Sequence, residues 1–202
     1  MNRYWTVPRH WAGETVAILG CGPSLSLVDF DALRASGQRV IAINDAIFEF
    51  PDADILYFCD QKWWDGEFGR RERVEKLGIP FWRVTLENEI PGVFRLRNTG
   101  ATGFDEDPQC LRHGSNSGYQ AMHLATHLGA ARIILHGFDM RIVRGELHAM
   151  ARRERQDAVG FGRVLREEML PKFQTLVEPL RERGVEVINA TPGSALTCWS
   201  AS

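Results

Sequence analysis

Short apolar runs that end in glycine or polar residues recur along the chain. Residues 16–19 are consecutive apolar residues that lead into Gly20, and the run 55–59 leads into Asp60. Continuous apolar runs of this length are typical of strands that are buried on both faces of a parallel sheet. The runs that predict strands are 15–19, 39–43, 55–59, 81–84, 132–135 and 185–189.

Helical segments alternate with these strands. Residues 29–36 form a short segment closed by Gly37, and residues 114–127 carry an apolar stripe that ends at Gly129. Glycine just after the last turn is a common helix stop signal. Charged segments with regularly spaced apolar residues predict two more helices, at 62–77 and at 159–183, the second with kinks at its prolines.

The alternation of strands and helices predicts an α/β fold. We expect a single doubly wound, mostly parallel, Rossmann-like sheet with helices on both faces, in one domain spanning 1–202. The interval 87–114 shows neither a helical nor a strand period. A loop of this length inside a compact domain is uncommon and is often functional, so we expect a lid-like insertion there.

A glycine-rich turn follows the first predicted strand. Its residues Gly20, Gly22, Pro23 and Ser24 lie between that strand and an expected helix. Glycine lets a ligand approach the backbone, proline suits the first helical turn, and the free amides of a helix N-terminus attract anions. The turn predicts a phosphate cradle; a plain strand-to-helix turn is the alternative.

Polar residues also follow other predicted strands. Asn44 and Asp60 follow the second and third strands, and Asp139 follows the strand 132–135. Because ligands bind at the carboxyl edge of open parallel sheets, all three are candidate nucleotide contacts.

The helix before strand 132–135 begins with a second polar cluster. Asn116, Ser117 and Gly118 follow Ser115 at its N-terminus. Helix capping would explain one of the polar side chains of Ser115, Asn116 and Ser117 but not all three together, so this cluster predicts a second phosphate site.

Basic residues are frequent after Asp139. Arg141 begins an arginine-rich run that also contains His148. Cations at this place could pair with a phosphate, and a histidine can act as a general base near neutral pH. A solvated surface loop is the alternative for both residues.

Charge and cysteine content indicate what kinds of partner and which cellular location to expect. The 24 Lys and Arg residues nearly balance the 26 Asp and Glu residues, which leaves no basic footprint for duplex nucleic acid. The four cysteines are widely spaced, and no signal peptide or long apolar run stands out. These features predict a cytoplasmic protein with reduced thiols and no membrane span, and a homo-oligomer is compatible with them.

Three other kinds of site have weaker support in the sequence. His123 and His127 lie four residues apart on one predicted helix, but the pattern supplies no third metal ligand. Cys21 at a helix N-terminus could have a lowered thiol pKa and act as a nucleophile. The first turn is also close to the fingerprint of an NAD(P)-dependent oxidoreductase, with Asp45 as the acid, although Leu25 replaces its third glycine.

The order of these motifs resembles that of bacterial lipooligosaccharide sialyltransferases. Phage-encoded proteins and the archaeal family similar to 6-hydroxymethylpterin diphosphokinase share much of the same layout. The resemblance spans about residues 14–196, and its shared features are Gly20-x-Gly22-Pro23-Ser24-Leu25, Asn44, Ser117-Gly118, Gly129, Gly137-x-Asp139 and Pro192-x-Ser194.

The resemblance implies a cytidine monophosphate sugar as donor. It makes Gly22, Ser24, Asn44, Ser117 and Gly118 nucleotide contacts, and a backbone role then becomes the expected one for the turn's cysteine. The chain departs from the family after Gly137-x-Asp139. The sialyltransferases have a tyrosine that meets the donor phosphate where this chain has Arg141, and their general base matches His148 in order but not in local sequence.

Together these features predict a nucleotide-binding transferase. The first hypothesis is a glycosyltransferase that uses a CMP-sugar-like donor and an unidentified acceptor, with His148 as general base and no required cofactor. The second is an ATP-dependent diphosphokinase on a pterin-like molecule, with Mg²⁺ held by acids such as Asp60 or Asp139. A non-catalytic nucleotide-binding module is the third, from a different class.

Overall fold

The structure is a computed structural model that describes residues 4–66, 70–78, 80–143 and 158–199. The strands are β1 (Thr15–Leu19), β2 (Arg39–Ile43), β3 (Ile55–Phe58), β4 (Trp82–Leu86), β5 (Phe94–Asn98), β6 (Cys110–Leu111), β7 (Arg132–His136) and β8 (Glu186–Asn189). The helices are η1 (Pro23–Leu27), α1 (Phe30–Ala35), α2 (Ala46–Glu49), α3 (Gln61–Asp65), α4 (Arg70–Leu77), α5 (Ser117–Leu128), α6 (Ala158–Val164), η2 (Leu165–Met169) and α7 (Leu170–Glu182).

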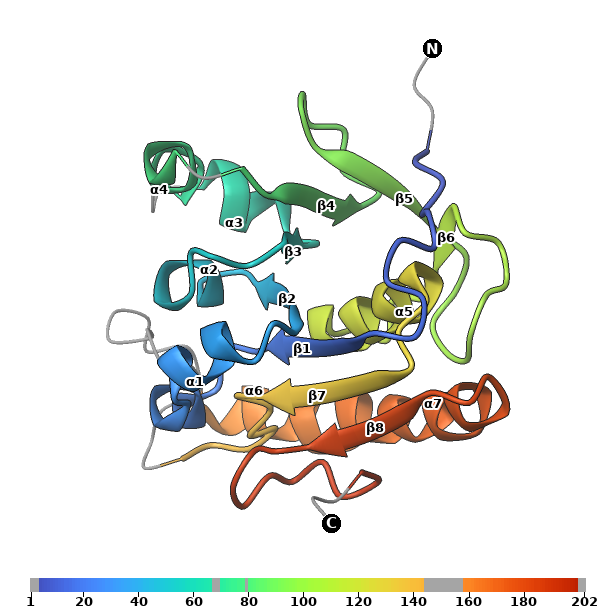
Figure 1. Cartoon of the computed structure of the whole chain (residues 1–202). Helices are drawn as coiled ribbons and strands as arrows, with labels where there is room; N and C mark the ends of the chain where they lie inside the picture. Colours follow the sequence, from blue (N-terminus) through green and yellow to red (C-terminus); the bar gives the residue numbers. More distant parts are fainter. Residues whose placement is uncertain (1–3, 67–69, 79, 144–157, 200–202) are drawn as a thin grey trace.

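The eight strands form one parallel sheet in the order β6-β5-β4-β3-β2-β1-β7-β8 (Figure 1). The chain first builds outward from β1 to β6, then crosses back along α5 and adds β7 and β8 on the other side of β1. This is the predicted doubly wound α/β architecture. The order of addition reverses between β1 and β7, the type of position where open α/β sheets bind ligands.

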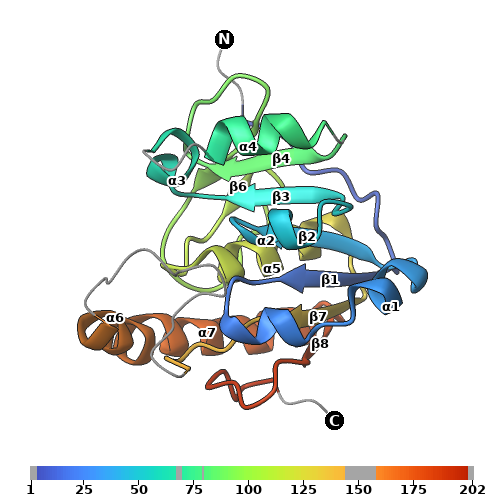
Figure 2. The ribbon, with the colours of Figure 1, turned by 90° about the vertical axis from the view of Figure 1, so that its left-hand side faces the viewer.

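Alternating side chains of the strands feed two hydrophobic layers. Ile18 and Tyr57 point into a layer with Leu124 of α5 and Phe173 of α7. Leu19 and the other strand residues that point to the opposite face pack with α1 to α4. Helices therefore lie on both faces, and Figure 2 shows α6 and α7 along the β7–β8 end of the sheet. Continuous apolar strands are the sequence signature of a sheet buried on both sides.

The segment 87–114 differs from the irregular lid expected for it. It contributes β5, which pairs with β4, and the short β6, which pairs with β5. In β5 only Leu96 is fully buried while its neighbours Arg95 and Arg97 are charged. An apolar residue between charged ones is a weak strand signal, and it becomes a strand here because β4 offers a free edge.

The other helices follow the sequence pattern with two changes. The segment 62–77 holds two helices, α3 and α4, and the long segment 159–183 is interrupted by the π-helical turn η2. In η2 the Leu170 amide donates to the Leu165 carbonyl, five residues back. Pro171, which lacks an amide, follows directly, so the proline expected to kink this helix sits beside the irregular turn.

A buried histidine pair on α5 anchors the crossover between β5 and β6. The amides of Asp105 and Arg112 lie 3.2 Å from Nε2 and 3.3 Å from Nδ1 of His123. The His127 Nε2 atom lies 3.1 Å from the Cys110 carbonyl oxygen. Burial, with a smaller contribution from His127, lowers the pKa of His123 from 6.5 to about 3. These histidines are therefore neutral structural groups at neutral pH.

We predict that His123 makes the fold sensitive to mild acid. The unfolded chain binds a proton near pH 6.5 but the folded chain resists it until about pH 3, so stability falls as pH falls through that window. A single such group contributes a slope of up to about 1.4 kcal/mol per pH unit. His123→Gln should lower the free energy of unfolding at pH 7 but flatten this slope, as measured by urea denaturation between pH 7 and pH 4.

The exposed His10 supplies the control, since His10→Gln removes a histidine without touching the buried pair. An unchanged slope in His123→Gln would mean that other groups carry the acid sensitivity.

Candidate functional site

The glycine-rich turn after β1 runs against the end of β7. The Gly20 amide donates to the His136 carbonyl at 2.8 Å, and the Gly22 amide donates to the Gly137 carbonyl at 2.9 Å. A Cβ atom on Gly20 would lie 2.7 Å from the Gly137 oxygen. Real Cβ atoms essentially never come so close, so these glycines are required by the neighbouring backbone itself.

An internal carboxylate occupies the predicted phosphate cradle. Ser24 donates its amide to Asp139 Oδ2 at 3.2 Å and its hydroxyl to the same oxygen at 2.7 Å. A Cβ atom on Gly22 would lie 2.1 Å from that oxygen. Ser24 is 8% exposed and Asp139 is 3% exposed, so the anion held by this turn belongs to the protein.

The helix opened by Pro23 is also shorter than expected. It is η1, a five-residue 3₁₀ helix, and not a full α-helix. Its amides therefore offer a weaker anion site than the sequence indicated, because a short helix aligns few peptide dipoles.

Strained backbone marks the same edge of the sheet. Among the residues that the structure describes, four other than glycine have positive φ: Asn44 at 48°, Glu87 at 63°, Ser115 at 52° and Met140 at 50°. Each follows the exit of a strand at the carboxyl edge. Backbone of this kind costs free energy and clusters at functional sites in proteins.

Asn44 has a further unusual feature. Its Oδ1 atom is buried and has no hydrogen-bond partner among the described residues. Its neighbours are Cys21, whose thiol donates to the Ile43 carbonyl at 3.0 Å, and the end of β3. A buried polar atom without a hydrogen-bond partner costs free energy of folding, so the Asn44 oxygen is a candidate contact for a ligand.

The N-terminus of α5 lies at the end of β3. The Ser117 hydroxyl lies 3.2 Å from the Cys59 thiol, and Asn116 Oδ1 accepts from the Gly118 amide at 2.7 Å as an N-cap. A Cβ atom on Gly118 would lie 2.5 Å from the Phe138 ring. Gly118 is thus required for packing against the residue after Gly137, while Ser117 lies near the end of β3.

The α7 helix adds a cation that the sequence did not single out. Lys172 Nζ donates to Ser115 Oγ at 2.5 Å, just before the N-terminus of α5. Burial and the charge of Lys172 together lower the pKa of His113. In the sequence Lys172 is one charged residue of an amphipathic helix, and only the packing of α7 beside α5 brings it to the edge.

Three residues that the sequence predicted as site residues remain: Asp60, Arg141 and His148. Asp60 is exposed and caps α3 by accepting from the Lys62 amide at 2.8 Å. Arg141 is exposed, with its guanidinium next to Gly193. His148 lies outside the described residues.

The three alternative chemistries find little support. The Cys21 thiol pKa is raised to about 12, chiefly by burial and by the nearby Asp45 carboxylate, so the expected lowering does not occur. Asp45, the acid of the dinucleotide pattern, forms an ion pair with Arg70 at 3.0 Å and accepts from the Trp63 indole. Within the described ranges no group of three or more His, Cys, Asp or Glu residues could hold a metal ion.

Comparison of the chain with models of protein families gave no match, and a search of curated proteins gave none either. In the part of the chain that the structure describes, no helix is both long and apolar enough to cross a membrane.

We predict that Ser24 and Asp139 stabilise the fold as a coupled pair without any ligand. Asp139→Ala leaves the buried Ser24 amide and hydroxyl without an acceptor and should cost about 2–4 kcal/mol, whereas Ser24→Ala should cost about 1–2 kcal/mol. In the double variant the two losses should not add, because both remove the same bonds. Urea denaturation of the single and double variants measures this coupling.

Ser26→Ala in the same 3₁₀ helix is the control, since its exposed hydroxyl donates to the local Pro23 carbonyl. Fully additive losses for Ser24 and Asp139 would contradict the prediction.

Proposed function

We propose that the chain is a nucleotide-binding transferase, and specifically a glycosyltransferase that uses a nucleotide-activated sugar. The observation that carries the proposal is the edge formed by the ends of β1 to β3 and the N-terminus of α5. There the unpartnered Asn44 oxygen, the Ser117 hydroxyl and the Lys172 ammonium group come from three separate elements.

Each of these groups suits one part of a nucleotide. An amide oxygen such as Asn44 Oδ1 can accept from a base or ribose, which are rich in N–H and O–H donors. A helix N-terminus with a lysine beside it suits a phosphate, because the helix dipole and the ammonium charge are both positive. The resemblance to sialyltransferases supports the same assignment for Asn44, Ser117 and Gly118.

The hydrogen bonds between Ser24 and Asp139 change which residues are assigned to the phosphate. Because Asp139 takes the amide of Ser24, the turn at Gly20–Ser24 is assigned the role of shaping the wall of the site. The phosphate is assigned to the N-terminus of α5 and to Lys172 instead. The diphosphokinase remains the second candidate, and strict dependence on Mg²⁺ would favour it, because phosphoryl transfer normally needs a metal to bridge phosphate oxygens.

We predict that cytidine monophosphate raises the melting temperature of the protein in the presence of EDTA. Ligand that binds only the native state stabilises it by RT ln(1 + [L]/Kd). Lys172→Met should weaken CMP binding by about 10- to 100-fold, the loss of one charge-assisted bond, and leave binding of cytidine unchanged. Calorimetry with CMP and cytidine separates the phosphate contribution.

Lys62→Met on α3 is the matched control, because Lys62 is an exposed lysine of another helix. Stabilisation by ATP only with Mg²⁺ and none by CMP would move the assignment to the diphosphokinase. If no nucleotide stabilises the protein, the nucleotide site itself is wrong.

We also predict that His148 is the general base. His148→Ala should lower kcat by roughly 10²- to 10⁴-fold while CMP affinity stays the same, since a base that meets the acceptor acts mainly in the transition state. The activity of the wild-type protein should fall as the pH drops below the pKa of that histidine, because a protonated imidazole cannot accept a proton. Unchanged turnover in His148→Ala would leave the basic run as a solvated loop.

A further inference from the structure

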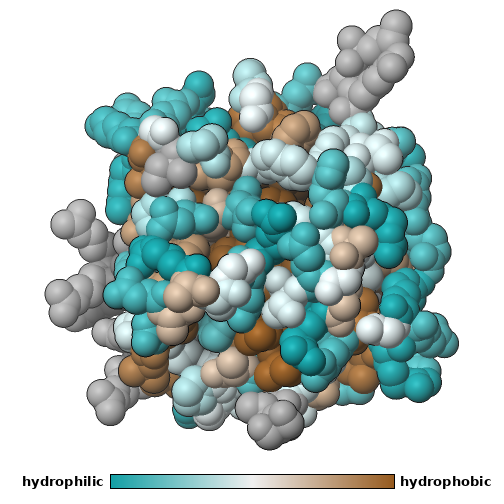
Figure 3. Space-filling model, in the orientation of Figure 1, coloured by the Kyte–Doolittle hydropathy of each residue, from teal (hydrophilic) through white to brown (hydrophobic). Residues whose placement is uncertain are grey.

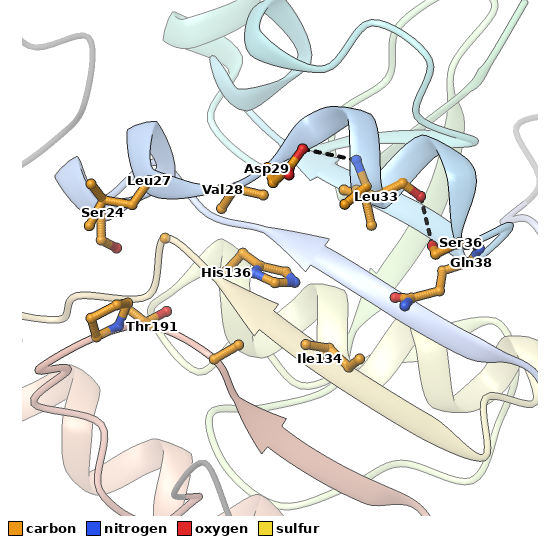
Figure 4. Close-up of a pocket in the computed structure, with 14 residues that line it drawn as sticks. Ser24, Leu27, Val28, Asp29, Leu33, Ser36, Gln38, Ile134, His136 and Thr191 are labelled. Atoms are coloured by element: carbon orange, nitrogen blue, oxygen red, sulfur yellow. Dashed lines mark hydrogen bonds between the residues drawn. The ribbon is translucent and has the colours of Figure 1, made fainter.

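A cavity of about 390 Å³ lies on the sheet face opposite α7. Its floor consists of Ile134 and His136 on β7, which point away from the hydrophobic layer that Ile133 and Leu135 join. Val28 and Leu33 form the wall on the α1 side (Figure 4). Figure 3, in the orientation of Figure 1, shows hydrophobic residues exposed between hydrophilic ones on this side of the molecule.

The cavity is elongated along the strands. Val16 pairs with both Arg39 and Ile133, so Gln38 lies level with the start of β7 while His136 lies at its end. Four residue steps separate these levels, which is about 13 Å of extended backbone. Figure 4 shows Gln38 near one end of the group and Ser24 and Thr191 near the other.

A polar atom in this cavity lacks a partner in the described part of the chain. Gln38 Oε1 is buried without a hydrogen-bond partner there, and the His136 ring also lines the cavity. Burial lowers the pKa of His136, so its imidazole is neutral at neutral pH. The Thr191 hydroxyl, by contrast, already accepts from the Phe138 amide at 2.9 Å.

The charges around the cavity exclude one class of ligand. The described residues that line it include no lysine or arginine, and its one acid, Asp29, caps α1 by accepting from the Asp31 and Ala32 amides. An anion here would lose its hydration without gaining a cation. An uncharged molecule with a donor group would satisfy Gln38 at little cost.

We propose that this cavity is a second ligand site, which binds an uncharged, elongated small molecule. Its apolar body would lie on Ile134 between α1 and β7, and its N–H group would donate to Gln38 Oε1. The volume is within the usual range for small-molecule sites. Ser24 of the glycine-rich turn borders this cavity, but the residues proposed to contact the nucleotide, Asn44, Ser117 and Lys172, do not line it.

Three probes of nearly equal shape test the proposal: 4-butylbenzamide, 4-butylacetophenone and 4-butylbenzoate. Only the amide has an N–H donor, and the benzoate is an anion at neutral pH. Calorimetry should show that the amide binds about tenfold or more tightly than either of the others. Gln38→Met should remove the advantage of the amide over the ketone.

Two alanines of α1 provide the matched variants. Ala32 and Ala35 are both exposed, but only Ala32 lines the cavity. Ala32→Trp should fill the space and weaken binding of the amide by at least about 30-fold, whereas Ala35→Trp should leave it unchanged, with the melting temperature of each variant recorded.

Equal binding of the three probes would overturn the proposal. So would an affinity for the amide that Ala32→Trp leaves intact, or no binding of the amide up to its solubility limit. Because none of these measurements uses a nucleotide, they succeed or fail independently of the proposed transferase activity.

Discussion

All eight strands run in the same direction, and this one constraint fixes where chemistry can occur. Parallel strands need crossovers that return the chain to the same starting edge, and the crossovers that contain helices also cover a face of the sheet. The loops that follow the strands therefore gather at the carboxyl edge. Asn44, Ser115 and Met140, which carry strained backbone, are found there because that is where the chain must turn.

The contact between β1 and β7 determines how much of that edge is open. Beyond the ends of the two strands, the amides of Gly20 and Gly22 still donate to backbone carbonyls of the segment that follows β7 or ends it. The Asp139 carboxylate then accepts hydrogen bonds from Ser24. The reversal point of the sheet is thus closed by protein groups. The proposed nucleotide site therefore lies beside this point, at the ends of β1 to β3, where the N-terminus of α5 and Lys172 supply positive charge.

The same topology explains the cavity between α1 and β7, which is the proposed second ligand site. In β7, Ile133 and Leu135 are fully buried under α5 and α7, whereas Ile134 and His136 on the other face are only partly buried. A parallel strand is normally covered on both faces, so the partly covered face of β7 leaves space beside α1. The two proposed sites thus have different origins, one at the edge of the sheet and one on its face.

The sequence by itself determined the fold class, because the continuous apolar runs and the glycine stops of α1 and α5 are local signals that the tertiary structure obeys. It could not determine that β5 and β6 are strands, since their pattern is weak until β4 provides an edge. Nor could it separate a glycine kept for a ligand from one kept for packing. Gly22 meets Asp139 and Gly118 meets Phe138, residues far away along the chain. Only the tertiary structure decided that Asp139 is a partner of the glycine-rich turn and that Lys172 lies beside α5, because such contacts depend on how distant elements pack and not on the residues next to them.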